Sequence, residues 1–296
     1  MKKLSTVFLW VAMIGLVLIN TNCAHIPSQK PVKLSNKITP PERKNIPGER
    51  FSLSTGKMFI PDYYKAPKDG KFDLVVFFHG AAWCSEQVFY EGRKNAVLVS
   101  ISLSDYQGYF EDTTRFQKIL DEIVLTLDTT GIIHNPSIDR ICISSFSGGY
   151  SAPREILKTP AYYNRINDMI LADSLYCSFT DTTRRHLNEE QMAPFLHFAQ
   201  DAAKGEKYFW FTQLYPPEKK YRDNTTTKTA TYLIEHLHGK RVSRYQVNKL
   251  GMTLLYSFET GNCHILGYAG MTNQDHFNHL YNLGEYYSKL PFETIP

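Results

Sequence analysis

Short apolar runs that alternate with segments of helical periodicity are the feature that most restricts the fold of this chain. The runs are rich in Val, Ile and Phe. Buried parallel strands read as continuous apolar runs, and the connections between them cross the faces of the sheet as helices. The pattern therefore predicts an α/β fold, with a mostly parallel sheet of about seven or eight strands and helices on both faces. The runs assigned to strands are residues 57–63, 73–78, 96–102, 140–144, 168–172, 208–212 and 252–257.

The segments between these runs carry apolar residues at the spacing of an amphipathic helix. In residues 114–127, for example, Phe116, Ile119, Leu120 and Ile123 fall on one face. A chain of 296 residues, 43% of them hydrophobic, has enough apolar surface for one large core, so we expect a single folded domain. The other segments with this periodicity are residues 189–203, 227–237 and 276–290.

The N-terminus has the basic and apolar regions of an export signal. Met1, Lys2 and Lys3 precede an apolar stretch that is too short to span a bilayer, and Cys23 follows it. A cysteine at this place resembles the lipidation site of bacterial lipoproteins, although Asn22 stands where a small residue is usual. This predicts an exported protein that is lipid-anchored to a bacterial membrane, with an ordinary cleaved signal as the alternative. The expected division is a signal at residues 1–22, the anchor cysteine and a flexible tether at 23–50, and the folded domain at 51–296.

The charge and the cysteines exclude several other classes of protein. A formal charge of +4, without a basic run among aromatic residues, gives no signal for nucleic acid. The remaining cysteines lie singly and have no metal-ligand spacing, so neither a metal nor a cofactor is expected. An oxidising compartment would permit disulfides among them, in a pairing that the sequence leaves open. They are Cys84, Cys177, Cys263 and Cys142, the last of which lies in an apolar run that favours a buried thiol.

The segment most informative about chemistry runs from Ile138 to Tyr150. An apolar strand leads directly into Ser145-Phe146-Ser147-Gly148-Gly149, where the central serine has small residues two positions to either side. This resembles the nucleophile elbow of the α/β hydrolases, G-x-S-x-G, with Ser145 in place of the first glycine. The resemblance covers residues 51–290 in element order and implies the α/β-hydrolase fold, with Ser147 as the nucleophile.

A second apolar strand ends in His79-Gly80-Ala81, at the place where the same family forms its oxyanion hole. The resemblance implies that the backbone N–H groups of Ala81 and Gly148 stabilise the negative oxygen of a tetrahedral intermediate. It also implies that His79 orders this loop and does not act as a base.

A serine nucleophile needs a histidine base, and an acid that orients the base, in the chain order Ser, acid, His. We assign the base to His276, which follows a glycine-containing loop before the last predicted helix. His264, on the loop after the last predicted strand, is its main rival, and His279 is expected to point along the helix as a packed or an exposed residue. We assign the acid to Asp173, which directly follows the strand at residues 168–172. The other candidate acids are Glu218, Asp223, Glu259 and Asp275.

Together these residues predict a serine hydrolase that cleaves an ester or other acyl bond of a small molecule through an acyl-Ser147 intermediate. A serine peptidase with the same triad is one alternative. The other is a surface lipoprotein that uses the fold as a non-catalytic binding module, which the departure at Ser145 leaves open. The loops expected to shape the pocket are rich in aromatic residues and span residues 81–90, 175–193 and 215–227.

Overall fold

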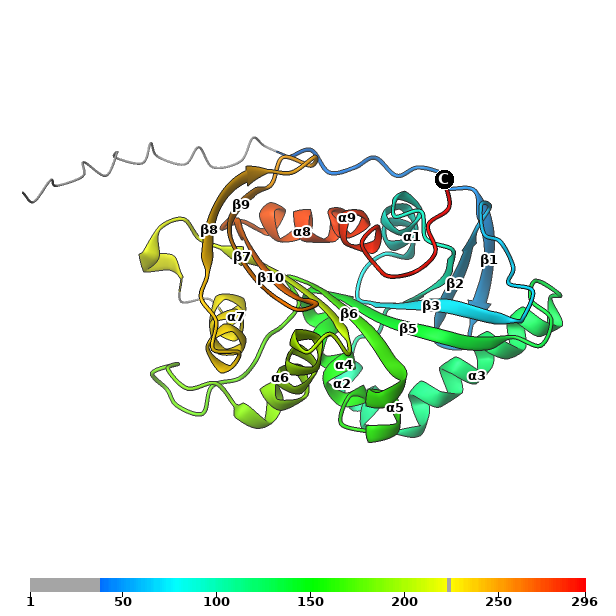
Figure 1. Ribbon diagram of the computed structural model, residues 1–296, viewed down its shortest axis with the longest axis horizontal. Helices are drawn as coiled ribbons and strands as arrows, with labels where there is room; N and C mark the ends of the chain where they lie inside the picture. Colours follow the sequence, from blue (N-terminus) through cyan, green and yellow to red (C-terminus); the bar gives the residue numbers. More distant parts are fainter. Residues whose placement is uncertain (1–37, 223–224) are drawn as a thin grey trace, which may run out of the picture. The chain divides into compact units, whose positions relative to one another are not determined.

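The computed structural model describes residues 38–222 and 225–296, which build one ten-stranded sheet with helices on both faces (Figure 1). The strand order is β1-β2-β4-β3-β5-β6-β7-β10-β9-β8, and the central strands from β4 to β10 are all parallel. The strands are β1 (Gly48–Leu53), β2 (Gly56–Pro61), β3 (Lys71–Phe78), β4 (Ala96–Ile101), β5 (Ser137–Phe146), β6 (Ile166–Ala172), β7 (Tyr208–Tyr215), β8 (Val242–Val247), β9 (Thr253–Thr260) and β10 (Cys263–Ala269).

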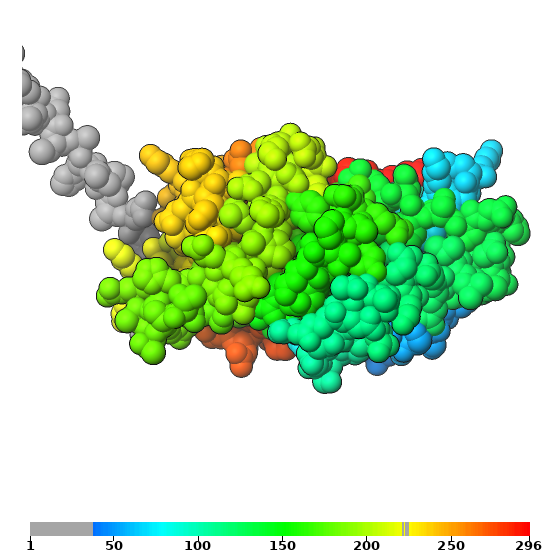
Figure 2. Space-filling view, turned by 90° about the horizontal axis from the view of Figure 1, so that it is seen from below, coloured from blue at the N-terminus to red at the C-terminus, as the bar shows by residue number. Residues whose placement is uncertain are grey.

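The helices lie in two groups, one on each face of the sheet (Figure 1). Helices α1 (Ala82–Glu91), α8 (Asn273–Tyr281) and α9 (Leu283–Tyr287) cover one face. The opposite face, which is turned toward the viewer in Figure 2, carries the remaining helices. These are α2 (Tyr106–Glu111), α3 (Thr114–Thr129), α4 (Ser151–Ile156), α5 (Pro160–Arg165), α6 (Glu189–Ala203) and α7 (Thr225–His236).

The alternation of side chains along each central strand divides the core into two layers. In β3, Leu74 and Val76 pack on the face of α3 and α6, whereas Val75 and Phe77 pack under α1 and α9. Because both faces are covered, every residue from Leu74 to Phe78 is buried, which explains why the strand reads as a continuous apolar run.

The chain direction across the sheet reverses between β3 and β5. From β3 the chain moves outward to β4, and it then returns to β5 on the other side of β3. The helices that follow β3 and β5 consequently lie on opposite faces, so the two connections diverge at the carboxyl ends of the strands. Open α/β sheets bind their ligands at such a switch point, and here the turns at Ala81 and Ser147 flank it.

Three strands of the sheet were not expected from the sequence, so the expected count of seven or eight is too low. Edge strands β1 and β8 are largely exposed, and they therefore lack the apolar run of a central strand. Strand β10 occupies residues that the sequence analysis treated as a loop. The folded body also begins earlier than residue 51, since Ile38 and Ile46 are buried in the core and β1 starts at Gly48.

The four cysteines among the described residues are all buried and none forms a disulfide, although the sequence left several pairings open. The expected burial of Cys142 as a thiol is confirmed, since its side chain is fully buried in β5. Within residues 38–222 and 225–296, no helix is both long enough and apolar enough to cross a membrane. The same part of the chain contains no cluster of three or more potential metal ligands.

Candidate active site

Ser147 lies at a sharp turn between β5 and α4. Its φ is +51°, a left-handed conformation that few residues other than glycine adopt. A Cβ atom on Gly149 would lie 2.5 Å from the carbonyl oxygen of Phe78 and 2.8 Å from Cβ of His79. Glycine is therefore required at position 149, because the elbow packs directly against the turn that follows β3. A serine in strained backbone geometry at the end of a central strand is the geometry of a nucleophile elbow.

Ser145, which replaces the usual first glycine of the motif, is fully buried and takes part in a hydrogen-bonded chain. Its hydroxyl lies 2.8 Å from Oγ of Ser174, and Ser174 Oγ donates a 2.8 Å hydrogen bond to the carbonyl oxygen of Ser147. Because the Ser174 proton is used in that bond, Ser145 must be the donor to Ser174. Serine in place of glycine at position 145 thus links the elbow by a hydrogen bond to the segment after β6.

Asp173 and His276 form a close pair, with Oδ2 of Asp173 2.6 Å from Nδ1 of His276. The other carboxylate oxygen of Asp173 accepts a hydrogen bond from the backbone N–H of Leu214 at 3.1 Å. Burial alone would raise the pKa of Asp173, but the hydrogen bond from His276 and the neighbouring His279 together hold this pKa below its ordinary value. A carboxylate kept ionised against Nδ1 of a histidine fixes the ring and its tautomer, leaving Nε2 free for a proton transfer.

His276 also lies directly beside the elbow. Its ring stacks on the ring of Phe146, the residue before Ser147, with centroids 4.5 Å apart and planes 29° apart. The imidazole is 18% exposed whereas Asp173 is 2% exposed, so the pair has a buried acid and an accessible base. Asp173 and His276, which are far apart in the sequence, are thus paired at the carboxyl edge of the sheet, and His276 packs on the residue before Ser147.

The two residues predicted to form the oxyanion hole, Ala81 and Gly148, lie at the starts of two helical segments, and their role stays a prediction. Gly148 lies in the first turn of the short 3-10 helix η1 (Ser147–Tyr150), and Ala81 is the residue before α1. The first N–H groups of a helix have no acceptor within it, so they are available to an incoming oxygen. The contact of Gly149 with Phe78 and His79 holds the two turns against each other.

His79 occupies a positive-φ position, at +71°, in the turn between β3 and Ala81. Its ring lies between Tyr106 and Phe146, at centroid distances of 6.0 and 6.3 Å. Burial, together with the nearby His276, lowers the pKa of His79. A neutral ring packed between two aromatic side chains suits the loop-ordering role expected for it.

Two other histidines considered as bases lie elsewhere. His264 was expected on a loop, which is wrong: it is the second residue of β10, near the opposite end of the strand from Ala269, and it stacks on Trp210 at 4.1 Å. Of the two alternatives left open for His279, packed or exposed, the structure shows the first, since the side chain is fully buried with Nδ1 2.8 Å from Oγ1 of Thr212. His276 itself lies within α8, which begins at Asn273, and not before the helix as the sequence indicated.

The rival acids that lie among the described residues are not paired with His276. Glu218 forms an exposed ion pair with Lys220 at 2.9 Å, and Glu259 is a half-exposed residue of β9. Asp275 caps α8, since its carboxylate accepts hydrogen bonds from the backbone N–H groups of Met271 and Thr272. Asp223 lies outside the described residues.

Two polar residues of the site were missed by the sequence analysis, namely Ser174 and Tyr176. Both follow Asp173 within three positions: Ser174 donates a hydrogen bond to the carbonyl oxygen of Ser147, and the ring of Tyr176 lies 5.4 Å from the ring of Tyr150 in the turn after Ser147. The signal that would have found them is the polar character of this short segment directly after a buried strand, at the edge where Ser147 also lies.

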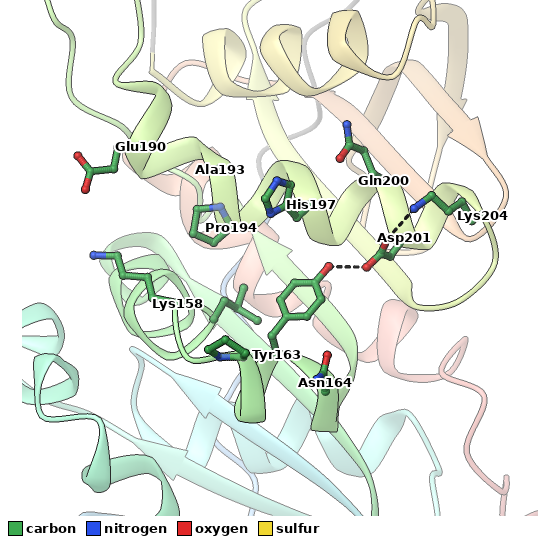
Figure 3. Close-up of a pocket in the computed structure, with 12 residues that line it drawn as sticks. Lys158, Tyr163, Asn164, Glu190, Ala193, Pro194, His197, Gln200, Asp201 and Lys204 are labelled. Carbon is green, nitrogen blue, oxygen red and sulfur yellow. Dashed lines mark hydrogen bonds and ion pairs between the residues drawn. The ribbon is translucent and has the colours of Figure 1, made fainter.

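The two largest of the cavities found among the described residues lie outside this arrangement. One of about 630 Å³ opens between α5 and α6, where Tyr163 donates a 2.6 Å hydrogen bond to Asp201 (Figure 3). The other, of about 960 Å³, lies along the loop before α8 and is mainly apolar. Neither is lined by Ser147, Asp173 or His276.

The strand order, the elbow and the placement of an acid–histidine pair after later strands define the fold as that of the α/β hydrolases. No protein-family model and no curated protein matches the chain. Solved structures resemble it at low identity. One is an acylaminoacyl peptidase of Pyrococcus horikoshii, with 13% identity and a TM-score of 0.44, and the match covers 82% of this chain and 40% of that one. Another is the poly(3-hydroxybutyrate) depolymerase LpqC of Bordetella parapertussis, with 9% identity and a TM-score of 0.42, and the match covers 80% of this chain and 86% of that one. A third is the siderophore hydrolase EstB of Aspergillus nidulans, with 11% identity and a TM-score of 0.45, and the match covers 86% of this chain and 99% of that one.

This chain thus spans less than half the length of the Pyrococcus peptidase and most of the length of the other two. These similarities concern the fold.

Proposed function

We propose that this protein is a serine hydrolase that cleaves an ester or other acyl bond through an acyl-Ser147 intermediate, and that its natural substrate is a carboxylic ester. The observation that carries the proposal is the 2.6 Å pair of Asp173 and His276 beside a positive-φ serine at the end of β5. A structural ion pair would not need a strained serine next to it, and a simple strand-to-helix turn would not need a buried acid behind a histidine.

In the proposed reaction, His276 Nε2 takes the proton of Ser147 as its Oγ attacks the acyl carbonyl. Asp173 remains ionised and stabilises the imidazolium that forms, which its lowered pKa favours. The N–H groups of Ala81 and Gly148 donate hydrogen bonds to the oxyanion. The imidazolium then protonates the leaving group, and water releases the acyl group with His276 as the base. The mechanism uses no cofactor or metal.

The surroundings of Ser147 suit an acyl group of moderate size. Tyr150 and Tyr176 flank the nucleophile with ring centroids 5.4 Å apart, and Phe277 lies beside Phe146 with 43% of its surface exposed. Such aromatic walls bind an apolar or aromatic acyl chain without imposing a charge requirement. We further propose that the protein is exported and held on a bacterial membrane through Cys23.

Labelling with a fluorophosphonate tests the proposal directly. The full chain, purified in mild detergent, is expected to gain one adduct by intact mass, and Ser147→Ala none. His276→Ala is expected to react far more slowly than the wild type. Glu259→Gln is a suitable control, because this carboxylate lies in β9 away from the site. A folded wild-type chain that stays unlabelled would overturn the proposal and leave the binding-module alternative. Comparison of ester with amide substrates separates an esterase from a peptidase.

A further inference from the structure

Strand β7 is hydrogen-bonded both to the acid of the site and to the helix that carries the base. The carbonyl oxygen of Thr212 accepts a 2.7 Å bond from the backbone N–H of Asp173, and the N–H of Leu214 donates to the Asp173 carboxylate at 3.1 Å. The side chain of the same threonine contacts α8, since its Oγ1 lies 2.8 Å from Nδ1 of His279. Thr212 therefore joins the two elements on which the acid–histidine pair depends.

Helix α8 is bonded to the body of the fold at two histidines, His276 and His279. Nδ1 of His276 meets Asp173 at 2.6 Å, and Nδ1 of His279 meets Thr212 at 2.8 Å. The two histidines are three residues apart, so their side chains leave the helix on the same face, with Cβ atoms about 5–6 Å apart. A shift or rotation of α8 that breaks the inner bond therefore also moves the ring of His276.

The second half of α8 holds this helix to the core. Its buried residues are Asn278, His279 and Leu280, whereas Asp275 caps the exposed first turn. Asn278 accepts a 3.0 Å hydrogen bond from Gln274 within the helix, and the contact of Leu280 with the core is apolar and has no preferred direction. The bond of His279 to β7 is directional, and it therefore defines where the helix lies on the sheet.

The ring of His279 is fully buried and is fixed at its Nδ1 atom. Its edge meets the ring of Tyr268 at a centroid distance of 5.7 Å. Nε2 is buried and has no hydrogen-bond partner among residues 38–222 and 225–296. Burial, against the opposing charge of Asp173, lowers the pKa of His279 to about 4, so the ring is neutral near pH 7. The ring therefore acts as a neutral hydrogen-bonding group whose orientation depends on Thr212.

We propose that Thr212 and His279 are positioning residues of the triad, because the hydrogen bond between them fixes α8 where Nδ1 of His276 meets Asp173. The inference rests on the proposed function, in which His276 is the base. Neither positioning residue touches the reacting atoms. Without their bond, His276 would spend less time in the position from which it takes the proton of Ser147. A misplacement of about 1 Å can lower a catalytic rate by about 100-fold.

Two variants of Thr212 separate the hydroxyl from the rest of the side chain. Thr212→Val has nearly the same shape and no hydroxyl, whereas Thr212→Ser keeps the hydroxyl and lacks the methyl group. Both retain the backbone bond from Asp173. His279→Leu removes the same bond from the helix side, so it tests the proposal even if Thr212→Val does not fold.

Ser100→Ala is the matched control. Oγ of Ser100 in β4 lies 2.6 Å from Oγ of Ser85 in α1, so this variant also removes a buried hydroxyl that joins a strand to a helix. Strands β3, β5 and β6 lie between β4 and β7 in the sheet. A loss of activity that comes only from weakened packing would appear in this control as well.

The experiment uses the full chain in mild detergent and has two readouts. The first is kcat and KM for p-nitrophenyl acetate, with the concentration of active sites taken from the extent of fluorophosphonate labelling. The second is the proton NMR signal of the Nδ1 proton of His276, assigned by its loss in His276→Ala. A proton in a short hydrogen bond to a carboxylate gives a signal far downfield, and this signal does not depend on turnover.

We expect Thr212→Val and His279→Leu each to lower kcat by about 10- to 100-fold, to leave KM within about threefold, and to weaken the downfield signal. The double variant should lose no more than either single variant, because both remove one bond. Thr212→Ser should stay within about threefold of the wild-type kcat, and Ser100→Ala should match the wild type in both readouts.

Two results would overturn the positioning role. One is an unchanged kcat and downfield signal in Thr212→Val and His279→Leu. The other is an equal fall in Thr212→Val and Thr212→Ser, which would mean that the methyl group matters and the hydroxyl does not. A wild-type chain that neither labels nor hydrolyses the ester would instead overturn the proposed function. The NMR signal would still report whether Thr212 positions His276, so the two failures are distinguishable.

Discussion

Asp173 is a buried carboxylate with two hydrogen-bond donors, His276 and the backbone of Leu214. Asp173→Asn keeps the size of the side chain, but the amide no longer favours the tautomer that leaves Nε2 free to accept a proton. We expect turnover of an ester to fall by about 10⁴-fold, as for the corresponding change in a serine protease triad. The measurement is kcat for p-nitrophenyl acetate.

Asp275→Asn is the matched control for this change, because Asp275 lies next to His276 in sequence yet only caps α8. It is expected to lower the free energy of unfolding by about 1 kcal/mol and to alter kcat by only a few fold. If Asp275→Asn were as inactive as Asp173→Asn, the assignment of the acid would be wrong.

His279 makes stability depend on pH. Burial, against the opposing charge of Asp173, lowers the pKa of His279 to about 4, whereas the pKa of a histidine in an unfolded chain has its ordinary value of 6.5. The unfolded state therefore binds a proton that the folded state excludes, and the stabilisation present above pH 6.5 is lost as pH falls toward 4. This one group should remove about 2 kcal/mol between pH 7.5 and about pH 5.

His279→Gln removes this titration and keeps an amide within reach of Thr212. Urea unfolding at the two pH values is expected to show a smaller loss of stability on acidification for the variant than for the wild type. An equal loss in both chains would mean that His279 is protonated in the folded state.

At the scale of elements, the hydrogen-bonded chain of Ser145, Ser174 and Ser147 joins β5 to the segment after β6. Ser174→Ala removes both bonds and leaves two buried polar groups without their partner, so it should lower the free energy of unfolding by about 1–3 kcal/mol. Ser145→Ala removes only one bond and should have the smaller effect. The double variant is expected to lose less than the sum of the two, as thermal or urea unfolding would show. Additive losses would mean that the two hydroxyls do not interact.

The individual elements differ in how far the sequence determined them. Central strands such as β3 and β5 are covered on both faces, so burial imposes a continuous apolar run that can be recognised. Strand β8 has exposed residues along nearly its whole length, and its pairing with β9 leaves no comparable pattern. Strand β10 is buried, but Gly267 and His264 interrupt its apolar run, and the close approach of the Tyr256 ring explains the glycine. A strand can therefore be recognised from the sequence when both of its faces are buried.

At the scale of the whole molecule, the site depends on the order of the strands in the sheet, which cannot be predicted from the patterns of a single sequence. The motifs at Ser147 and Ala81 could be found because each requires particular small residues at a turn. The choice of Asp173 over Glu218 or Glu259 follows from pairing across the sheet, since Ala172 lies beside Phe146 and both strands end at the same edge. The contacts of Ser174 and Tyr176 with the elbow depend on the same pairing, and no local pattern could reveal them.

The predicted N-terminal signal and the proposed chemistry together give a prediction about the whole protein at the membrane proposed for it. If Cys23 is the lipidated first residue of the mature chain, cells that express the protein should incorporate labelled palmitate into it, and Cys23→Ser should abolish this. A single acyl chain binds a bilayer only marginally, so more than one chain is expected on the mature N-terminus by mass spectrometry. Since an acyl-Ser147 intermediate could also retain palmitate, Ser147→Ala is the necessary control and should remain labelled. Label lost in Ser147→Ala and kept in Cys23→Ser would place the acyl group on the nucleophile, and a mature chain without lipid would indicate an ordinary cleaved signal.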